Sequence, residues 1–312
     1  MVLDFNHKTV LLKETIDFLK VIPNGIYIDG TAGGGGLSIN IAKKLDSRSG
    51  KLICIDQDPD AIKECNKRLN RYENIILINE NFVKMKKILN NLNIDKVDGI
   101  VLDLGVSSYQ LDEANRGFSY KKEAPLDMRM SKSGLSAFEV INEYDPKELA
   151  RIIKIYGEEK YSKNIATAIS IHRKKKTIES TTELANIISN CVPFSYKEKG
   201  HPAKKTFQAI RIYVNSELEN LEKGLDSSID LLKKYGRLCV ITFHSLEDRI
   251  VKHKMLDWSK PCKCPPDFPI CTCGQVPKSE IVTKKPVLPS NDEIKENNRS
   301  RSAKLRVCQK IV

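Results

Sequence analysis

The chain has 312 residues, of which 40% are hydrophobic, and its formal net charge is +12 at pH 7. This length allows one large domain or two ordinary ones, and the hydrophobic fraction excludes wholesale disorder. No apolar run approaches the roughly 18 residues of a membrane helix, and the N-terminus lacks the pattern of a secretory signal. The nine cysteines are mostly isolated, which argues against a disulfide framework. We therefore expect a cytoplasmic protein without a membrane partner.

The excess of positive charge fits either a polyanionic partner or an ordinary lysine-rich surface. A basic surface raises the local concentration of polyanions and speeds their encounter. Two segments concentrate the charge: the run 173–176, and the tail from Arg299 onward, which includes Arg301 and contains no acid. Both are candidate phosphate contacts, although each run alone is more often a solvated face.

Five short apolar runs predict the buried strands of a parallel sheet. These runs are 25–29, 51–56, 75–79, 97–103 and 237–243. Helical patterns at 38–45, 59–70 and 82–92 separate the first four of them. Because strand and helix alternate, we expect an α/β fold with a Rossmann-like sheet that is covered by helices on both faces.

The fourth and fifth strands are separated by about 130 residues, far more than a crossover needs. Helical patterns fill this stretch at 145–156, 162–173 and 180–191. We therefore predict an inserted helical domain at 110–205, with the sheet domain formed by 1–109 and 206–312. The return segment 206–235 should form one or two amphipathic helices. Two β-like runs, 281–288 and 304–311, should then close the sheet as an antiparallel pair.

A glycine-rich loop follows the first predicted strand, in the segment DGTAGGGGLS at 29–38. Gly33, Gly35 and Gly36 allow the backbone to approach a ligand closely. Such a loop also suits a dinucleotide, because a helix N-terminus attracts phosphate, so an NAD-dependent oxidoreductase is one alternative. Asp29 favours S-adenosylmethionine (SAM), because a carboxylate there would repel a pyrophosphate but can hold the ammonium group of a methionine moiety.

Two further acids end predicted strands at the same edge of the sheet. Asp56 suits the ribose hydroxyls of SAM, although NAD enzymes also place an acid at this position. Asp103 closes the fourth strand. Capping or turn roles are common for single acids at such positions, but three at one ligand-binding edge favour a site. Phe82, after the third strand, either packs on the adenine face or is a core residue that opens a helix.

The segment DLGVSSYQLD at 103–112 is polar and contains no cysteine. Enzymes that methylate pyrimidine C5 need a cysteine nucleophile, so direct transfer to a nitrogen or oxygen is favoured. Asp103, Ser107, Ser108 and Gln110 are suited to accept hydrogen bonds from an amine and to orient its nitrogen toward the methyl carbon. The Asp/Asn-Pro-Pro-aromatic loop of many amino-methyltransferases is absent. The residues themselves therefore leave the acceptor atom open.

Long strings from end to end of the chain resemble the small-subunit ribosomal RNA (cytosine-N4)-methyltransferase family, the MraW type. The N-terminal half carries HKTVLLKE at 7–14, DGTAGGGGLS at 29–38, IDQDPDA at 55–61, DLGVSSYQLDEANRGFSY at 103–120 and PLDMRM at 125–130. The C-terminal half carries YGEEKYS at 156–162, HPAKKTFQAIRIYVNSEL at 201–218, GRLCVITFHSLEDRIVK at 236–252 and NNRSRSAKLRV at 297–307. Strings of this length and rarity are highly specific.

The resemblance implies an enzyme that uses SAM to methylate N4 of a specific cytidine in the decoding region of 16S rRNA. Its partner would be the small ribosomal subunit, no DNA is expected, and the target base must be flipped or unpaired. The cofactor contacts that the resemblance implies are Gly35, Gly36, Leu37, Asp56, Phe82, Asp103 and Gln110. Leu37 stands where the family usually has histidine, and we expect a backbone contact there. Lys205 replaces a common arginine, which keeps the charge but loses the bidentate fork.

Three further residues are candidate RNA contacts with structural alternatives. Arg116 and Arg129 lie in RGFSY and PLDMRM, where they either position RNA phosphate or order the active loop. His244, in TFHSLEDR at the end of the fifth strand, either lines the target-base pocket or precedes a helix N-terminus. A ribosome-assembly factor that binds rRNA without catalysis is the alternative outside enzymes.

Four cysteines form two Cys-x-Cys pairs in the proline-rich loop 261–277. They are Cys262, Cys264, Cys271 and Cys273. Four thiolates can hold a structural zinc ion, but the spacing is tighter than that of the usual Cys-x2-Cys knuckle. The alternative is a loop with four reduced cysteines.

Overall fold

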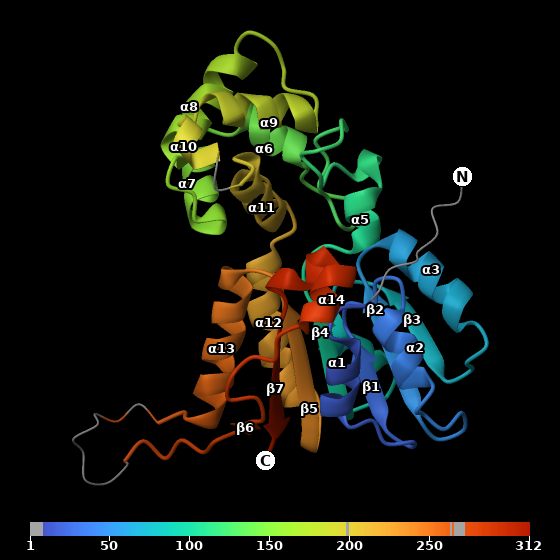
Figure 1. Ribbon diagram of the computed structural model, residues 1–312. Helices are drawn as coiled ribbons and strands as arrows, with labels where there is room; N and C mark the ends of the chain where they lie inside the picture. Colours follow the sequence, from blue (N-terminus) through green and yellow to red (C-terminus); the bar gives the residue numbers. More distant parts are fainter. Residues whose placement is uncertain (1–8, 198–199, 263, 265–271) are drawn as a thin grey trace. The chain divides into compact units, whose positions relative to one another are not determined.

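The computed structural model describes residues 9–197, 200–262, 264 and 272–312 of the chain (Figure 1). The chain divides into two compact units. The sheet unit comprises Met1–Gly105 and Leu218–Val312, and the helical unit comprises Val106–Glu217. Among the described residues, no helix has the length and apolar character needed to cross a membrane.

The sheet unit is built on seven strands in the order β3-β2-β1-β4-β5-β7-β6. The strands are β1 Ile26–Asp29, β2 Lys51–Asp56, β3 Ile75–Asn79, β4 Val97–Asp103, β5 Leu232–Thr242, β6 Ser279–Ile281 and β7 Lys304–Lys310. Strands β1 to β5 are parallel, and β7 runs antiparallel to both of its neighbours. This mixed sheet with flanking helices confirms the predicted α/β fold with a Rossmann-like sheet.

The end of the sheet differs from the prediction for 281–288. Strand β6 ends at Ile281. Beyond it, the N–H groups of Val282 and Thr283 donate to the Val307 carbonyl of β7, and an isolated bridge joins Val287 to Leu305. Pro286 and Pro289 lack a backbone N–H, so this segment cannot continue a hydrogen-bonded ladder. The hydroxyl of Thr283 instead accepts a hydrogen bond from the backbone N–H of Val307 at 2.9 Å.

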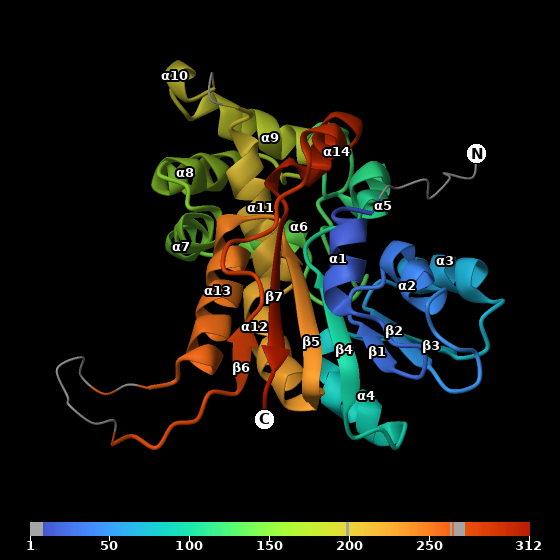
Figure 2. The same ribbon diagram turned by 60° about the horizontal axis from the view of Figure 1, so that its bottom comes forward.

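Helices cover both faces of the sheet, as Figures 1 and 2 show. One core cluster contains side chains of α1 Leu12–Leu19, α2 Gly36–Ala42 and α3 Pro59–Leu69. The opposite cluster contains side chains of α4 Met85–Asn91, α12 Glu217–Leu231 and α13 Ser245–Ser259. Within β5, Leu238 and Val240 belong to the second cluster, whereas Cys239 and Ile241 belong to the first. This alternation is the two-residue period of a strand buried on both faces.

The predicted helix 82–92 consists of two elements, a short 3₁₀ turn followed by an α-helix. Phe82–Lys84 forms a 3₁₀ turn, whose first N–H groups are capped by Asn81, and α4 begins only at Met85. By contrast, the predicted helix 59–70 matches α3, where the carboxylate of Asp58 accepts a hydrogen bond from the Asp60 N–H. After β6 the chain forms the short helix α14 Asn291–Glu296 and a 3₁₀ turn at Asn298–Ser302 before entering β7.

The helical unit has its own hydrophobic core. Its helices are α5 Ser108–Asp112, α6 Ala137–Glu143, α7 Pro146–Gly157, α8 Ser162–Arg173, α9 Thr181–Asn190, α10 Phe194–Lys197 and α11 Ala203–Val214, with a 3₁₀ turn at Ala114–Arg116. Arg173, the first residue of the basic run 173–176, donates to the carbonyls of Ile141 and Tyr144. The Arg173 guanidinium therefore caps the end of α6, so this residue has a structural role in addition to its place in the basic run.

Candidate active site

The carboxyl ends of three neighbouring strands bring the three predicted acids to one edge of the sheet. Asp29 of β1 lies in register with Cys54 of β2 on one side and with Val101 of β4 on the other. Asp56 and Asp103 each lie two residues farther along their strands. Strands β2 and β3 lie on one side of β1 and β4 on the other, so β1 is the topological switch point where open α/β sheets bind ligands.

Asp29 is completely buried and contacts the loop that follows it. Its Oδ2 accepts a hydrogen bond from the Ser38 hydroxyl at 2.6 Å, and its Oδ1 accepts one from the Thr31 N–H at 3.3 Å. Burial raises the pKa of Asp29 to about 6, although these hydrogen bonds lower it. Asp29 therefore connects β1 to the first turn of α2 and helps to fix the glycine loop, in addition to its predicted role at the ammonium group.

The glycine loop requires glycine at two positions because of its backbone conformation. Gly33 and Gly35 have φ values of 52° and 79°, in the left-handed region. A Cβ atom at Gly36 would lie 1.8 Å from the hydroxyl oxygen of Thr9, so Thr9 lies close against the loop. The Leu37 side chain is buried in the core beside α2. Any ligand contact at this position must therefore come from the backbone, in agreement with the predicted backbone contact.

Asp56 supports the same loop from the end of β2. Its two carboxylate oxygens accept hydrogen bonds from the N–H groups of Gly33 and Asp58, both at 2.8 Å. Burial raises the pKa of Asp56 to about 6. Each carboxylate oxygen has a second lone pair, so this residue is able to accept two more hydrogen bonds from a ligand diol.

Phe82 is packed against a helix of the sheet unit. A Cβ atom at Gly224 of α12 would lie 2.3 Å from Cε2 of the Phe82 ring. The ring thus occupies the space that a side chain at Gly224 would need. Phe82 is only partly buried against the core residues of this face, so the core role is present, and packing on the adenine stays a prediction.

Replacing Gly224 with alanine should lower the affinity for SAM. The helix itself should gain about 1 kcal/mol from the substitution, but the added methyl group would displace the Phe82 ring. If that ring stacks on adenine, losing the stack should cost about 1–3 kcal/mol of binding free energy. Titration calorimetry with SAM measures the effect, and Lys223→Ala, on the exposed face of the same helix, is the control. Equal affinities for the two variants would contradict the role of Phe82.

Asp103 is the member of the three with the most unusual environment. Its backbone N–H donates to the Thr31 hydroxyl at 2.6 Å, which joins β4 to the glycine loop. Its side-chain Oδ1 is buried and accepts no hydrogen bond within the part of the chain that the structure describes. Burial and the nearby charges of Asp29 and Glu247 raise the pKa of Asp103 to about 8. A buried acceptor of this kind is costly unless a ligand supplies a donor.

The affinity for SAM should therefore increase as the pH rises through about 8. The Asp103 carboxyl binds its proton more tightly in the folded protein than when unfolded, so its contribution to stability is fully present below about pH 4 and disappears through about pH 8. A cationic ligand favours the ionised form and must displace this proton. Calorimetry between about pH 7 and about pH 9 should show the affinity of the wild type rising relative to that of Asp103→Asn, because the amine of SAM titrates alike for both proteins. The same slope in both proteins would contradict this assignment.

Ser107, Ser108 and Gln110 follow Asp103 in the chain and belong to the helical unit. The Ser107 hydroxyl accepts a hydrogen bond from the Gln110 N–H at 3.2 Å, and the Gln110 side chain accepts one from the Ser107 N–H at 3.0 Å. This reciprocal capping box begins α5. Ser108 and Gln110 are buried. The three residues thus form one ordered turn. In this turn the side-chain carbonyl oxygen of Gln110 already accepts a hydrogen bond from a backbone N–H.

The basic residues of the helical unit differ in their exposure and in the groups to which they donate hydrogen bonds. Arg116 is buried, and its guanidinium donates to the carbonyls of Arg129 and Met130, each at 2.9 Å, which supports the loop-ordering role. Arg129 forms an ion pair with Asp127 at 2.6 Å, and 30% of its side chain remains exposed. Lys205 is exposed and donates to the Glu158 carbonyl at 3.0 Å. Arg129 and Lys205 are therefore the more accessible candidates for phosphate.

His244 begins α13 at the same carboxyl edge of the sheet. It is the N-cap residue of a capping box with Glu247, whose carboxylate also accepts a hydrogen bond from the Phe243 N–H at 2.8 Å. The His244 Nε2 lies 3.1 Å from Glu247 Oε1, without the alignment of a hydrogen bond. His244 thus precedes a helix N-terminus, as the structural alternative predicted, and it also caps that helix. A contact with the target base stays a prediction.

The basic tail contains both exposed and paired side chains. Arg299 and Arg301 lie exposed on the 3₁₀ turn before β7. Lys304 and Arg306 pair with Asp248 of α13, at 3.0 and 2.6 Å, and 39% of the Lys304 side chain remains exposed, compared with 11% for Arg306. Arg299, Arg301 and Lys304 are therefore more accessible to RNA phosphate than Arg306.

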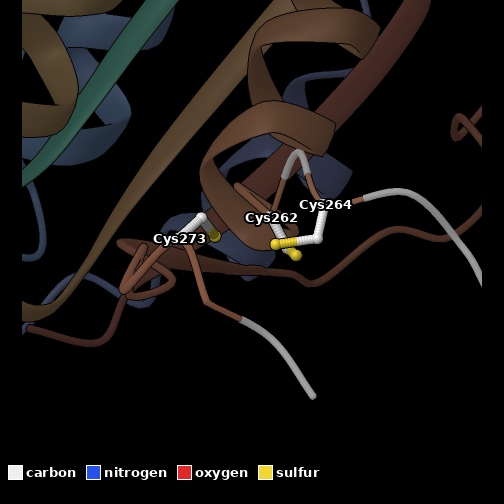
Figure 3. Close-up of side chains that lie close together, drawn as sticks. All are labelled: Cys262, Cys264 and Cys273. Atoms are coloured by element: carbon white, nitrogen blue, oxygen red, sulfur yellow. The ribbon is translucent and has the colours of Figure 1, made fainter. Parts of the chain in front are cut away.

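The cysteine-rich loop of the sheet unit brings three of its thiols together. The Sγ atoms of Cys262, Cys264 and Cys273 lie within 4.8 Å of one another (Figure 3). Cys271, the fourth predicted ligand, lies outside the described residues.

Three residues that hold the site together were missed by the motif analysis. Thr31 and Ser38 lie inside the glycine segment and bond to Asp103 and Asp29. Gly224 provides the space for Phe82. An isolated glycine inside a helical pattern often marks close packing, and this signal could have identified Gly224.

The residues at this edge fit SAM better than a dinucleotide. The fully buried Asp29 lies beside the glycine loop, as does the Oδ1 of Asp103, which has no hydrogen-bond partner among the described residues. A sulfonium or ammonium group would favour the ionised form of both carboxyl groups, whereas a pyrophosphate would be repelled by it. Asp56 offers acceptors for a diol, and Phe82 offers a ring for a base. This donor set therefore supports the predicted cofactor.

Comparison with known proteins agrees with these features. The model of the MraW methylase family matches residues 4–311. Ribosomal RNA small subunit methyltransferase H of Clostridium botulinum (strain Kyoto) is 57% identical over 310 residues, covering 99% of this chain and 100% of that protein. The protein of the same name from Lachnospira eligens is 51% identical and covers 99% of both chains. A solved rRNA methylase from Streptococcus thermophilus is more distant, with 10% identity and a TM-score of 0.43 over 98% of both chains. The chain therefore belongs to the MraW methylase family.

Proposed function

We propose that this protein transfers the methyl group of SAM to N4 of a specific cytidine in the decoding region of 16S rRNA, in the cytoplasm. Membership of the MraW methylase family supports the proposal, as do full-length relatives that are named ribosomal RNA small subunit methyltransferase H. The observation that carries it is Asp103 Oδ1, a buried acceptor without a partner among the described residues, at the ligand-binding edge of the sheet.

The sheet unit would hold the cofactor through the residues around the glycine loop. Asp56 would accept hydrogen bonds from the ribose hydroxyls, Phe82 would pack on the adenine, and backbone groups from Gly33 to Leu37 would lie along the methionine moiety. SAM supplies an electrophilic methyl group on a positively charged sulfur. The negative charges of Asp29 and Asp103 would favour binding of this cation, because both are held in a buried environment with few competing waters.

Asp103 would also orient the acceptor amine. The lone pair of an exocyclic amine is delocalised into the pyrimidine ring, so the nitrogen is a poor nucleophile. A carboxylate that accepts an N–H hydrogen bond pushes electron density back to the nitrogen and fixes its direction. The nitrogen then bonds to the methyl carbon as the carbon–sulfur bond breaks, and the extra proton on the nitrogen leaves to solvent.

The turn that begins α5 would contribute to the same step. Ser107 is four residues from Asp103, so the chain keeps their Cα atoms within about 14 Å of each other. Ser107 and Ser108 would supply further acceptors for the amine, and Gln110 would contact the cofactor. Because the capping box fixes this turn, these groups would need little reordering when the substrate binds.

RNA would be held mainly by contacts to phosphate. Arg129, Lys205, Arg299 and Arg301 are the accessible cations among the predicted contacts, and His244 would lie beside the target base. Phosphate contacts give affinity and salt dependence without sequence choice. The identity of the target base would therefore depend on the pocket that receives the unpaired cytidine.

The proposal is tested with the full-length protein, methyl-labelled SAM and small ribosomal subunits from cells that lack this gene. We expect label in the 16S rRNA with the wild-type protein and none with Asp103→Ala. Deproteinised 16S rRNA in a parallel reaction shows whether an assembled subunit is the substrate. A wild-type protein that binds the subunits but transfers no label would be a non-catalytic assembly factor, and the proposal would be wrong.

A further inference from the structure

The loop between α13 and β6 is long and irregular, and its base is held closed. It spans residues 260–278, and its described residues form neither helix nor strand. The Lys278 N–H donates to the Trp258 carbonyl at 2.8 Å, which joins the two ends. Val276 is 66% exposed, so this apolar side chain does not anchor the loop in a core. Irregular loops longer than about 12–15 residues are uncommon unless they have a function or an additional constraint.

Three thiols converge within this loop from two separate segments. Cys262 and Cys264 come from the outgoing segment and Cys273 from the returning one, and Figure 3 shows their sulfur atoms gathered together. The three Sγ atoms lie within 4.8 Å of one another. Sulfur atoms around one tetrahedral zinc ion, with Zn–S bonds of about 2.3 Å, lie about 3.8 Å apart. Two disulfide-bonded sulfurs would be about 2.05 Å apart.

The other described cysteines are not part of this cluster. Cys54, Cys65, Cys239 and Cys308 are buried, and burial raises the pKa of each thiol, whereas Cys191 is partly exposed in the helical unit. These thiols stay protonated in the core and behave as small apolar side chains. The clustered thiols are exposed or partly exposed, where a thiolate is solvated and accessible to a metal ion.

We propose that Cys262, Cys264 and Cys273 bind a structural zinc ion that closes the loop between α13 and β6. The sequence supplies a further thiol at Cys271, which lies outside the described residues. A metal ion that links two segments of a loop reduces the conformational freedom of the unfolded chain. Zinc binding to thiolates also contributes directly to the free energy of folding. The ion would thus constrain a loop in which the described apolar side chain of Val276 is exposed.

The zinc site would be remote from the cofactor. Helix α13 begins after β5, at the carboxyl edge that holds the three acids, and runs back along the sheet for its 15 residues to Ser259. Its end, and Ser279 of β6 opposite Lys310, lie at the amino edge of the sheet (Figure 1). The ion would therefore stabilise the loop without taking part in methyl transfer, and its loss should leave the affinity for SAM unchanged.

Metal analysis of the full-length protein tests the proposal directly. The protein is produced with zinc supplied and purified without a metal-binding tag, and we expect about one zinc per chain. Cys262→Ser and Cys273→Ser should lose the ion, whereas Cys191→Ser, at a cysteine of the helical unit, should keep it. Replacement of zinc by cobalt(II) should produce the intense visible absorption of tetrahedral thiolate coordination.

Limited proteolysis provides a readout that does not depend on activity. Removal of zinc by a chelator should speed cleavage at Lys260 and Lys278 while SAM binding, measured by calorimetry, stays the same. A wild-type zinc content no higher than that of Cys262→Ser would overturn the proposal. So would mass spectrometry that finds these cysteines joined as a disulfide in protein isolated under reducing conditions.

Discussion

Replacing Asp103 with alanine should reduce the rate of methyl transfer by about 100-fold or more while the protein remains folded. The substitution removes the carboxylate that would orient the amine and offset the positive charge of the cofactor. It also removes a buried acceptor that has no partner among the described residues, so the free energy of unfolding of the ligand-free protein should stay the same or increase. Rate and thermal stability should therefore change in opposite directions.

The measurement combines single-turnover transfer to small subunits with thermal unfolding of the same preparations. Asp98→Ala is the matched control, because Asp98 lies at the other end of β4. There its carboxylate accepts hydrogen bonds from the Ile26 N–H and the Lys233 ammonium, both at 2.8 Å. Asp98→Ala should lower stability and leave the rate per folded molecule intact. An Asp103→Ala protein with the wild-type rate would refute the site assignment.

Replacing Asp56 with alanine should weaken SAM binding by about 100-fold. Two hydrogen bonds from ribose hydroxyls to a carboxylate contribute about 1.5–3 kcal/mol each, and about 1.4 kcal/mol corresponds to a tenfold change. The substitution also removes the acceptor for the Gly33 N–H, so the glycine loop would lose one of its supports. Both effects act on the affinity for the cofactor and leave the orientation of the amine by Asp103 untouched.

Calorimetry with SAM, followed by transfer rates at saturating cofactor, separates these effects. The expected result is a large increase in the dissociation constant with a much smaller change in the saturated rate. Asp58→Asn is the control, because asparagine caps a helix as well as aspartate does and should preserve α3. Equal dissociation constants for Asp56→Ala and Asp58→Asn would show that Asp56 does not contact the cofactor.

The strands and the acidic edge of the sheet were predictable because their signals are local. A buried parallel strand must be apolar throughout, so runs such as 97–103 stand out in the sequence. The acids at their ends then fall at one edge, because parallel strands share a direction. The start of α3 is likewise predictable from neighbouring residues, because Asp58 is a favoured N-cap and Pro59 a favoured first helical residue. Predictions of this kind need no knowledge of the tertiary contacts.

Other features depend on contacts between residues far apart in the chain. Nothing near Asp29 indicates that Ser38 and Thr31 use its carboxylate oxygens, and nothing near Phe82 indicates its contact with Gly224. The apolar residues of 281–288 predict a strand over the whole segment, but Pro286 within it and Pro289 after it lack the N–H groups that a ladder needs, and β6 ends at Ile281. The helical unit begins at Val106 and ends at Glu217, since α5 and α11 pack by contacts that sequence patterns do not show.

The identity of the methylated nucleoside tests the central claim most directly. Small subunits from cells that lack the gene are incubated with the protein and with SAM whose methyl group carries deuterium, and the 16S rRNA is digested to nucleosides for mass spectrometry. We predict deuterated N4-methylcytidine as the labelled product, present with the wild-type protein and absent with Asp103→Ala. Deuterium in a different nucleoside, or at another position of cytidine, would contradict the account.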